Sequence, residues 1–276
     1  MPSRDRIQIV LVSPRNPLNI GAAARAMANF GFARLAIVAP YEPHWREANS
    51  DPHWREARSA IGAEDLLHSA RITESLADAV ADCTLVVGTG SLEHRKPEQP
   101  VVPLPELAPL VKQELARNGR IALVFGSEKR GLTQADLSHC HLLTIIPTDP
   151  AQPSMNLGQA VAVFLYEIAT RIGDSPAPDA NRRLVSDAAS PASTRDLELL
   201  AGLVDEIMLA ANYSPVAMRD ANRHDLNLLL RRLALTRGDA GRLLGFFRRI
   251  LWQLKPKSNR RDSSRKSRET QDGPRK

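Results

Sequence analysis

The chain has 276 residues, of which 43% are hydrophobic and 25% are charged, as in an ordinary globular protein. No apolar run reaches the length of a membrane span, and residues 1–7 lack the apolar stretch of a signal peptide, so we expect a soluble, cytoplasmic protein. The only cysteines are Cys83 and Cys140, which excludes a disulfide scaffold.

The positive charge is concentrated at the C-terminus. Residues 255–276 carry nine Lys or Arg against three Asp or Glu, and this surplus of six equals the formal net charge of +6. The segment has almost no apolar residues to offset its ordering entropy, so we expect a disordered basic tail. Such a tail serves either solubility or attraction to nucleic-acid phosphates.

Five apolar runs predict buried strands, at residues 7–12, 35–38, 85–87, 121–125 and 144–146. The segments between them predict helices at residues 20–30, 59–67, 76–82, 105–118 and 133–138. This alternation predicts an α/β fold with a mostly parallel sheet and helices on both faces.

A six-residue sequence, Pro-His-Trp-Arg-Glu-Ala, occurs twice, at residues 43–48 and 52–57. Its Trp and His side chains would suit base stacking. We favour instead a local duplication that lengthens one connection, with the tryptophans packed against the domain.

The composition changes after Ile172, where a polar, proline-rich stretch begins. We expect an α/β domain at residues 1–172, a linker at 173–192, a helical C-terminal domain at 193–254 and the tail at 255–276. Ser193 and Asp196 form a predicted capping box, and leucines at helical spacing follow. The helical domain contains four arginines that are either phosphate ligands or simply solvated: Arg231, Arg232, Arg248 and Arg249.

A glycine-rich loop, Phe125-Gly-Ser-Glu-Lys-Arg-Gly-Leu132, directly follows a predicted strand. Gly126 and Gly131 allow positive φ and close approach to a ligand. Open α/β sheets bind ligands at the carboxyl ends of their strands. The loop therefore indicates a ligand site, although a plain strand-to-helix connection would have the same glycines.

Two further segments accompany this loop. The first runs from Asn19 to Arg25, and Asn19 is its predicted helix N-cap. The small residues 21–24 would let this helix pack closely on the sheet. The second, Ser154 to Glu167, predicts a helix capped by Ser154 or Asn156.

In this order, the three segments resemble the three motifs of the SPOUT class of RNA methyltransferases, in its TrmH branch. Residues 9–14, the Gly62-Ala-Glu-Asp-Leu-Leu67 segment and the helical extension with Asn227 to Leu233 look most like the TrmJ-type tRNA enzymes. The resemblance covers nearly the whole chain before the tail.

The resemblance implies a C-terminal trefoil knot in the α/β domain, a homodimer and a knotted pocket for S-adenosylmethionine. The residues it assigns to the cofactor are Thr89, Gly90, Ser91, Gly126, Ile146, Pro153, Ser154 and Met155. It implies 2′-O-ribose methylation of tRNA, at a cytidine or uridine at position 32 of the anticodon loop. Ribosomal RNA is the alternative substrate.

A ribose 2′-hydroxyl is a poor nucleophile, so it must be oriented and its developing charge stabilised. The resemblance places Arg25 at this hydroxyl, with Asn19, Glu128, Ser154 and Asn156 in support. A guanidinium normally stays protonated, so we favour an orienting and electrostatic role for Arg25 over that of a general base.

Four basic residues near the pocket are predicted RNA phosphate contacts or exposed loop charges: Arg95, Lys96, Lys129 and Arg130. The run His139-Cys140-His141 invites a metal interpretation. Adjacent side chains point in different directions and no further cysteine pair completes a site, so we expect no metal.

Two other functions fit parts of the sequence. An NAD-dependent dehydrogenase would need a G-x-G-x-x-G fingerprint, which the glycine segments here do not match. A non-catalytic RNA-binding protein would need degraded catalytic positions, yet Asn19, Arg25, Glu128 and Asn156 are present.

Overall fold

The computed structural model describes residues 4–40, 60–90, 97–172, 190–213 and 215–254. The duplicated six-residue segment, most of the predicted linker, the predicted tail, Ser91, Arg95 and Lys96 lie outside the described residues, and the predictions made for them stay predictions.

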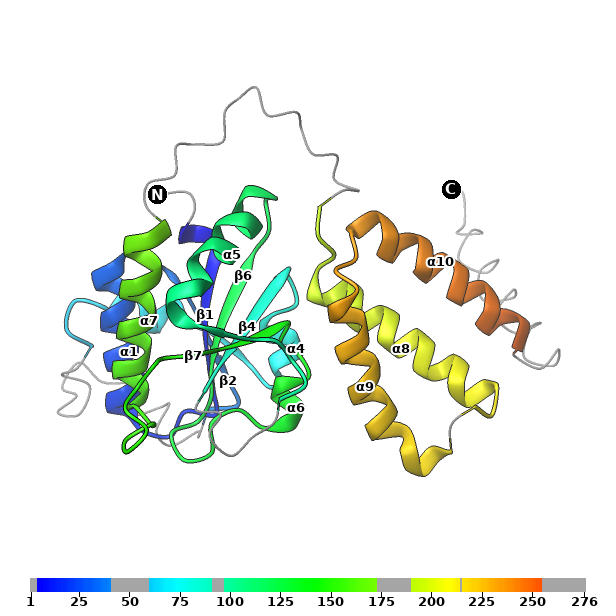
Figure 1. Ribbon diagram of the computed structural model, residues 1–276, viewed down its shortest axis with the longest axis horizontal. Coiled ribbons are helices and arrows are strands. Elements are labelled where there is room, and N and C mark those ends of the chain that lie inside the picture. Colours follow the sequence, from blue (N-terminus) through cyan, green and yellow to red (C-terminus); the bar gives the residue numbers. More distant parts are fainter. Residues whose placement is uncertain (1–3, 41–59, 91–96, 173–189, 214, 255–276) are drawn as a thin grey trace, which may run out of the picture.

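Seven strands form one sheet in the order β3-β2-β1-β6-β4-β7-β5 (Figure 1). All pairings between these strands are parallel. The strands are β1 (Ile7–Val12), β2 (Arg34–Val38), β3 (Arg71–Thr73), β4 (Leu85–Thr89), β5 (Val101–Pro103), β6 (Ile121–Phe125) and β7 (Leu142–Ile145). The predicted mostly parallel sheet is confirmed.

The sequence missed the two edge strands. β3 and β5 have three residues each, none of them fully buried, so neither contains the apolar run that marks a buried strand. The central strands β1 and β6 have the predicted bounds, because their side chains are buried on both faces of the sheet.

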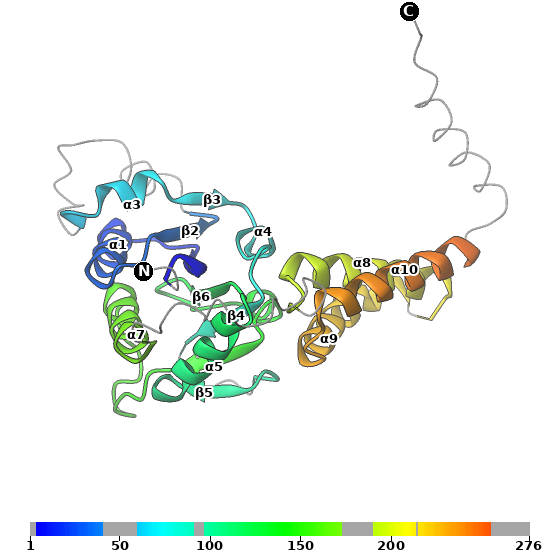
Figure 2. The same cartoon turned by 90° about the horizontal axis from the view of Figure 1, so that it is seen from above.

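Helices cover both faces of the sheet (Figure 2). Alternate residues of β1 belong to different buried clusters, Ile7, Ile9 and Leu11 to one and Val10 and Val12 to the other. On the first face lie α1 (Pro17–Phe30), α3 (Glu64–His68), α5 (Leu104–Ala116) and α7 (Leu157–Ile172). On the second face lie the short helices α4 (Leu76–Ala79) and α6 (Gln134–Leu137). The 3₁₀ turn η1 (Arg4–Arg6) precedes β1.

Helix α1 begins one turn earlier than predicted. Its N-cap is Asn16, whose side chain accepts a hydrogen bond from the Leu18 N–H, and Pro17 occupies the first helical position. The prediction that Asn19 is the N-cap is therefore wrong. Asn19 lies inside the helix and is only 7% exposed, which leaves its side chain available for contacts with other segments.

Three longer helices follow the α/β part: α8 (Thr194–Ala210), α9 (Arg219–Arg232) and α10 (Arg237–Leu254), with the 3₁₀ turn η4 (Val216–Met218) before α9. They share a buried cluster that includes Leu197, Leu200 and Leu230. The predicted capping box of Ser193 and Asp196 is confirmed. Ala192 is buried in the same cluster, so the packed helical part begins before residue 193. Within the described residues, no helix is long and apolar enough to cross a membrane.

Helices α1 and α7 pack closely because small residues meet at their contact. A Cβ atom added at Gly158 would lie 2.6 Å from the Ala22 Cβ, well inside van der Waals contact. The absence of a side chain at Gly158 therefore sets how near the two helices approach.

We expect Gly158→Ala to push α7 away from α1 and to lower the free energy of unfolding by about 1–3 kcal/mol, the usual cost of overpacking. Urea denaturation measures the effect. The control is Gln159→Ala, at the next and exposed position of α7. Equal stability of the two variants would contradict this account of the helix contact.

Candidate active site

A cavity of about 740 Å³ lies at the carboxyl ends of β4, β6 and β7. Its walls come mainly from residues 89–90, 125–131, 145–148 and 153–155, together with Leu157, Ala160 and Phe164 of α7. This is the sheet edge at which parallel α/β folds bind ligands, and the volume lies in the range of small-molecule sites.

The glycine-rich loop folds back on itself at the mouth of β6. Ser127 and Gly131 form an antiparallel bridge, and the Gly131 N–H donates to the Ser127 carbonyl at 2.8 Å. Gly131 has φ +64°, the left-handed region that favours glycine. A Cβ atom at Gly126 would collide with the Gly131 backbone, so both glycines are needed to close this loop.

The Glu128 carboxylate joins this loop to the segment around the start of α1. It accepts hydrogen bonds of 3.0 Å from the backbone N–H groups of Arg15 and Asn16 and from the Asn19 side-chain amide. Burial raises the pKa of Glu128, but the hydrogen bonds from Asn19 and the backbone outweigh it and hold the pKa below its ordinary value. The carboxyl is therefore ionised at neutral pH.

The Asn19 side chain extends this connection to the third segment. Its Oδ1 accepts a hydrogen bond of 2.8 Å from the Asn156 amide. The Asn156 Oδ1 in turn accepts from the N–H groups of Gly158 and Gln159, which makes Asn156 the capping residue at the start of α7. One hydrogen-bonded chain, Glu128–Asn19–Asn156, thus links all three sequence motifs beside the cavity.

All of the described residues assigned to the cofactor line the cavity: Thr89, Gly90, Gly126, Ile146, Pro153, Ser154 and Met155. Glu128, Lys129 and Arg130 line it as well. Asn19 and Asn156 do not line the cavity themselves. They are joined to Glu128, which lines it, by the hydrogen-bonded chain. Arg25 does not line the cavity of its own chain, because it lies on the exposed side of α1, away from the sheet.

The histidines of the His139-Cys140-His141 run have other partners. The His139 Nδ1 lies 3.1 Å from a Glu198 carboxylate oxygen, and the His141 Nδ1 accepts a hydrogen bond from the Val86 N–H. Burial, together with the charge of Arg231, lowers the pKa of His141 to about 3, so this ring is neutral. Burial also raises the pKa of the Cys83 and Cys140 thiols to about 12, so neither is a reactive thiolate.

Arg231 corrects one interpretation of the sequence. Its side chain is only 2% exposed and pairs with Glu198 at 3.0 Å, so it is not available to nucleic-acid phosphates. Helical spacing placed it in a leucine-rich helix but could not show that a carboxylate of α8 would bury it. No sequence pattern pointed to Glu198 either, since a single glutamate in an amphipathic helix is usually solvated.

Comparison with known proteins agrees with this geometry. The family described as SpoU rRNA Methylase family matches residues 6–166. The tRNA (cytidine/uridine/adenosine-2'-O-)-methyltransferase TrmJ of Pseudomonas aeruginosa is 41% identical over 165 residues, which span 59% of this chain and 60% of that protein. The tRNA (cytidine-2'-O-)-methyltransferase TrmJ of Methanocaldococcus jannaschii is 31% identical over 245 residues, or 88% of this chain and 98% of that one.

A solved structure extends the similarity beyond the α/β part. The crystal structure of TrmJ from Z. mobilis ZM4 superposes with a TM-score of 0.72 at 28% identity, and the match covers 88% of this chain and 98% of that chain. The match of residues 6–166 includes the first two motifs, all but the last residue of the third, and the strands that form the cavity. The chain therefore belongs to the SpoU rRNA Methylase family.

Proposed function

We propose that this protein transfers a methyl group from S-adenosylmethionine to a ribose 2′-hydroxyl of tRNA, at a cytidine or uridine at position 32 of the anticodon loop. The observation that carries the proposal is the Glu128–Asn19–Asn156 chain, because it brings the three motif segments together at one cavity. Family membership and the names of the relatives support the reaction and the substrate.

The cavity has the chemistry that S-adenosylmethionine requires. Gly90 leaves room at one wall, since a Cβ atom there would meet nothing within 4 Å, and Ile146, Met155 and Leu157 supply apolar contacts for an adenine ring. The backbone of residues 125–131 offers polar groups at the opposite wall. Bound there, the cofactor supplies an electrophilic methyl group.

The Glu128 carboxylate acts as a positioning group and not as the base. Three N–H donors occupy its two oxygens, and its pKa is lowered, so it is poorly suited to take a proton from the ribose. Its role is to fix Asn19 and the turn before α1. Ser154, which lines the cavity, and Asn156 hold the third wall.

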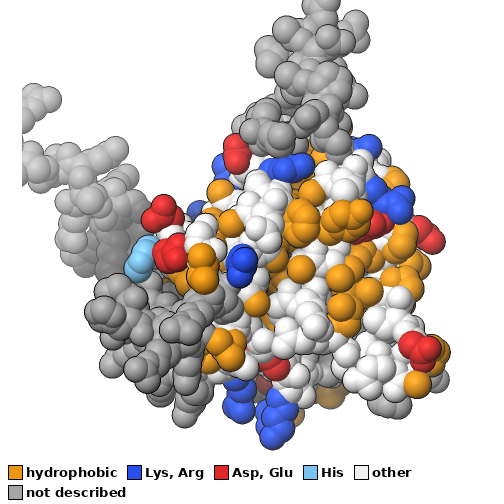
Figure 3. Space-filling view, turned by 90° about the vertical axis from the view of Figure 1, so that its left-hand side faces the viewer, with side chains coloured by type: hydrophobic (Ala, Val, Ile, Leu, Met, Phe, Trp, Pro, Cys, Tyr) orange, Lys and Arg blue, Asp and Glu red, His pale blue; other side chains and the backbone are white. Residues whose placement is uncertain are grey.

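We propose that the active form is a homodimer formed through the outer surface of α1 and α7. Leu18, Val163 and Tyr166 are 46%, 36% and 56% exposed there. Figure 3 shows hydrophobic side chains gathered on this side of the molecule. A large apolar area on one face favours a second copy as its occupant.

This dimer would explain the place of Arg25. Leu18 and Arg25 are seven residues apart in α1, which is two turns, so they lie on the same exposed face. Arg25 would then lie at the junction of two copies and orient a ribose hydroxyl at the partner's cavity, with its charge stabilising the developing alkoxide.

RNA contacts fit two surfaces. Lys129 and Arg130 are exposed at the rim of the cavity. On α10, Arg242, Phe246, Arg249 and Trp252 recur at spacings of four, three and three residues, and all four are exposed. The Arg249 guanidinium lies 4.4 Å from the centre of the Trp252 ring. Alternating arginines and aromatic rings suit phosphates and unstacked bases.

We also propose a trefoil knot in the α/β part and a separate helical domain at the C-terminal end. The strand order inserts β6 and β7 among strands that precede them in sequence, which suits the trefoil knot implied by the resemblance. The separate buried cluster of α8, α9 and α10 supports a distinct helical domain. Ribosomal RNA stays the alternative substrate, and a non-catalytic RNA-binding protein the alternative function.

The direct test is methyl transfer from labelled S-adenosylmethionine to purified tRNA, with the product nucleotide mapped by mass spectrometry. We expect 2′-O-methylation by the unchanged protein. We expect Arg25→Ala to lower kcat/KM about 10²–10³-fold, the usual cost of losing one electrostatic group, while cofactor affinity changes less than about twofold. Arg117→Ala, at an exposed position after α5, is the control.

Two outcomes would contradict these assignments. Methylation of ribosomal RNA but not of tRNA would favour the alternative substrate. Equal loss of cofactor affinity and methyl transfer in Arg25→Ala would exclude the orienting role.

We expect Glu128→Gln to lower the free energy of unfolding at pH 7 by about 1–2 kcal/mol, because an amide cannot replace the ionised acceptor. The folded pKa of Glu128 is lowered from 4.5, so its stabilisation is present above this pH and is lost as the pH falls through the folded value. The stability difference between protein and variant should therefore narrow below pH 4.5. Urea titrations across pH measure it, with the exposed Glu106→Gln as control.

We expect the protein to have twice the chain mass of 30.3 kDa in light scattering. The double variant Val163→Glu, Tyr166→Glu should be monomeric, since two buried carboxylates would oppose association. Ile61→Glu, at a 63% exposed apolar residue elsewhere, should stay dimeric. A dimer that survives the double substitution would place the interface on another surface.

A further inference from the structure

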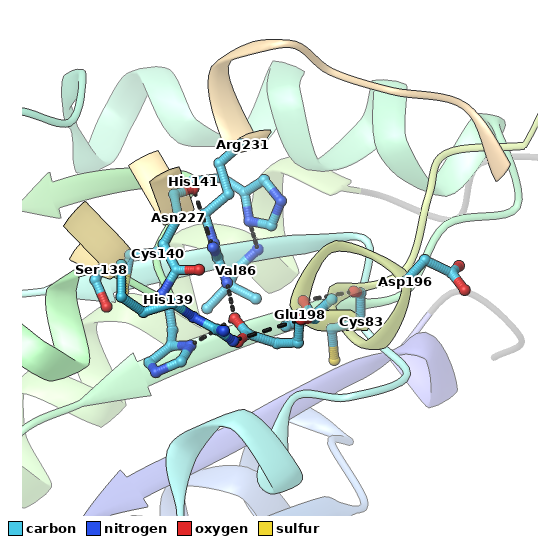
Figure 4. Close-up of polar contacts among 12 residues, drawn as sticks. Cys83, Val86, Ser138, His139, Cys140, His141, Asp196, Glu198, Asn227 and Arg231 are labelled. Carbon is cyan, nitrogen blue, oxygen red and sulfur yellow. Dashed lines mark hydrogen bonds and ion pairs between the residues drawn. The ribbon is translucent and has the colours of Figure 1, made fainter. Parts of the chain in front are cut away.

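A buried ionic network joins the C-terminal helices to the α/β part (Figure 4). Its centre is the Glu198 carboxylate of α8. One oxygen pairs with the His139 Nδ1 at 3.1 Å and with Arg231 of α9 at 3.0 Å, and the other pairs with Arg223 of α9 at 3.1 Å. His139 is the one partner of the three that belongs to the α/β part.

The network is largely shielded from water, although the Arg223 side chain is 32% exposed. The side chains of Glu198 and His139 are 20% and 19% exposed, and that of Arg231 is 2% exposed. Burial raises the pKa of Glu198, but His139 and Arg231 outweigh it and lower the pKa to about 2. A carboxylate that stays ionised in this surrounding holds its partners in fixed geometry.

The network is not the arrangement that stability alone would favour. Two buried polar atoms beside it, the Arg231 Nε and the Asn227 Oδ1, have no hydrogen-bond partner among the described residues. Well-packed apolar side chains in place of such a network are often at least as stabilising. What the network provides instead is a defined orientation of the C-terminal helices relative to the α/β part.

Few other contacts fix that geometry. The backbone N–H and the hydroxyl of Thr194 both donate to the Cys83 carbonyl, and the Arg195 N–H donates to the Ala81 carbonyl. Across the same junction, His224 lies 3.6 Å from Glu98. In the part of the chain that the structure describes, the buried apolar clusters of the two parts are separate. Helices α4 and α8 also touch at this junction, and the polar contacts give it defined distances and directions.

These contacts attach to the two strands that lead to the cavity. Cys83 lies just before β4, and His139 lies just before β7. The strands are paired side by side, and their carboxyl ends supply Thr89, Ile145 and Ile146 to the cavity wall. Each attachment point lies six residues before the wall, at most about 20 Å along the chain, and the nearer part of each stretch to the wall is strand.

We propose that Glu198 is a positioning residue that holds helices α8 to α10 at a fixed place relative to the methyl-transfer cavity, so that one RNA is engaged by both. The inference rests on the proposed function. The contacts of Glu198 lie outside the cavity, so their loss should weaken RNA binding and leave the chemistry of a correctly bound RNA unchanged.

The test compares His139→Gln, Glu198→Gln and the control Glu206→Gln, at an exposed glutamate of the same helix. His139→Gln removes the ion pair through which Glu198 contacts the α/β part, and it leaves the pairs of Glu198 with α9 in place. We expect KM for tRNA to rise about tenfold in His139→Gln and more in Glu198→Gln. We expect kcat and the affinity for S-adenosylmethionine to change less than twofold in both, and Glu206→Gln to behave as the unchanged protein.

A second measurement without RNA tests the geometry directly. Hydrogen exchange of the full chain should show faster exchange of the Thr194 and Arg195 amides in His139→Gln, while amides inside α8 and α9 keep their protection. Unchanged exchange of the Thr194 and Arg195 amides in His139→Gln would overturn the positioning role of Glu198. An unchanged KM for tRNA, or a fall in kcat alone, would overturn it as well. If the unchanged protein methylates no tRNA, the proposed function fails, and the exchange result still decides whether Glu198 holds the helices.

Discussion

The geometry of the candidate active site depends on the buried amide of Asn19. This side chain donates to Glu128 and accepts from Asn156, which are 109 and 137 residues away in sequence. A buried amide must satisfy both its donor and its acceptor, so its two partners are held in one arrangement. The three motif segments at the carboxyl edge of the sheet are thereby held in fixed positions relative to one another, and the cavity beside them has a defined shape.

Different interactions hold helices together inside the α/β part and hold the C-terminal helices against it. Helices α1 and α7 meet through small residues and an apolar core, with Gly158 against Ala22. The C-terminal helices meet the α/β part through Glu198, which pairs with His139 and is held from its own side by Arg231. Apolar packing tolerates many similar arrangements, whereas a charge-assisted network requires particular distances and angles. The polar contact thus suits a junction where orientation matters for a large substrate.

The sequence predicted the parallel sheet, the bounds of β1 and β6, the Ser193 capping box and the family, and all of these are confirmed. It missed β3 and β5, because three exposed edge residues produce no periodic signal. It placed the cap of α1 at Asn19, although Asn16 lies just before the helix-starting Pro17. The catalytic and cofactor roles of individual residues stay predictions, even where the residues line the cavity.

The hydrophobic pattern by itself predicted an α/β protein, because it is a local property of the sequence, and the resemblance of three ordered motifs indicated the methyltransferase family. Tertiary structure alone decided that Asn19 links Glu128 to Asn156, that Arg25 lies outside the cavity of its own chain, and that Arg231 is buried against Glu198. These are contacts between segments far apart in sequence. Their partners are chosen by which side chains the packed sheet and helices bring within hydrogen-bond distance, and no local pattern encodes that choice.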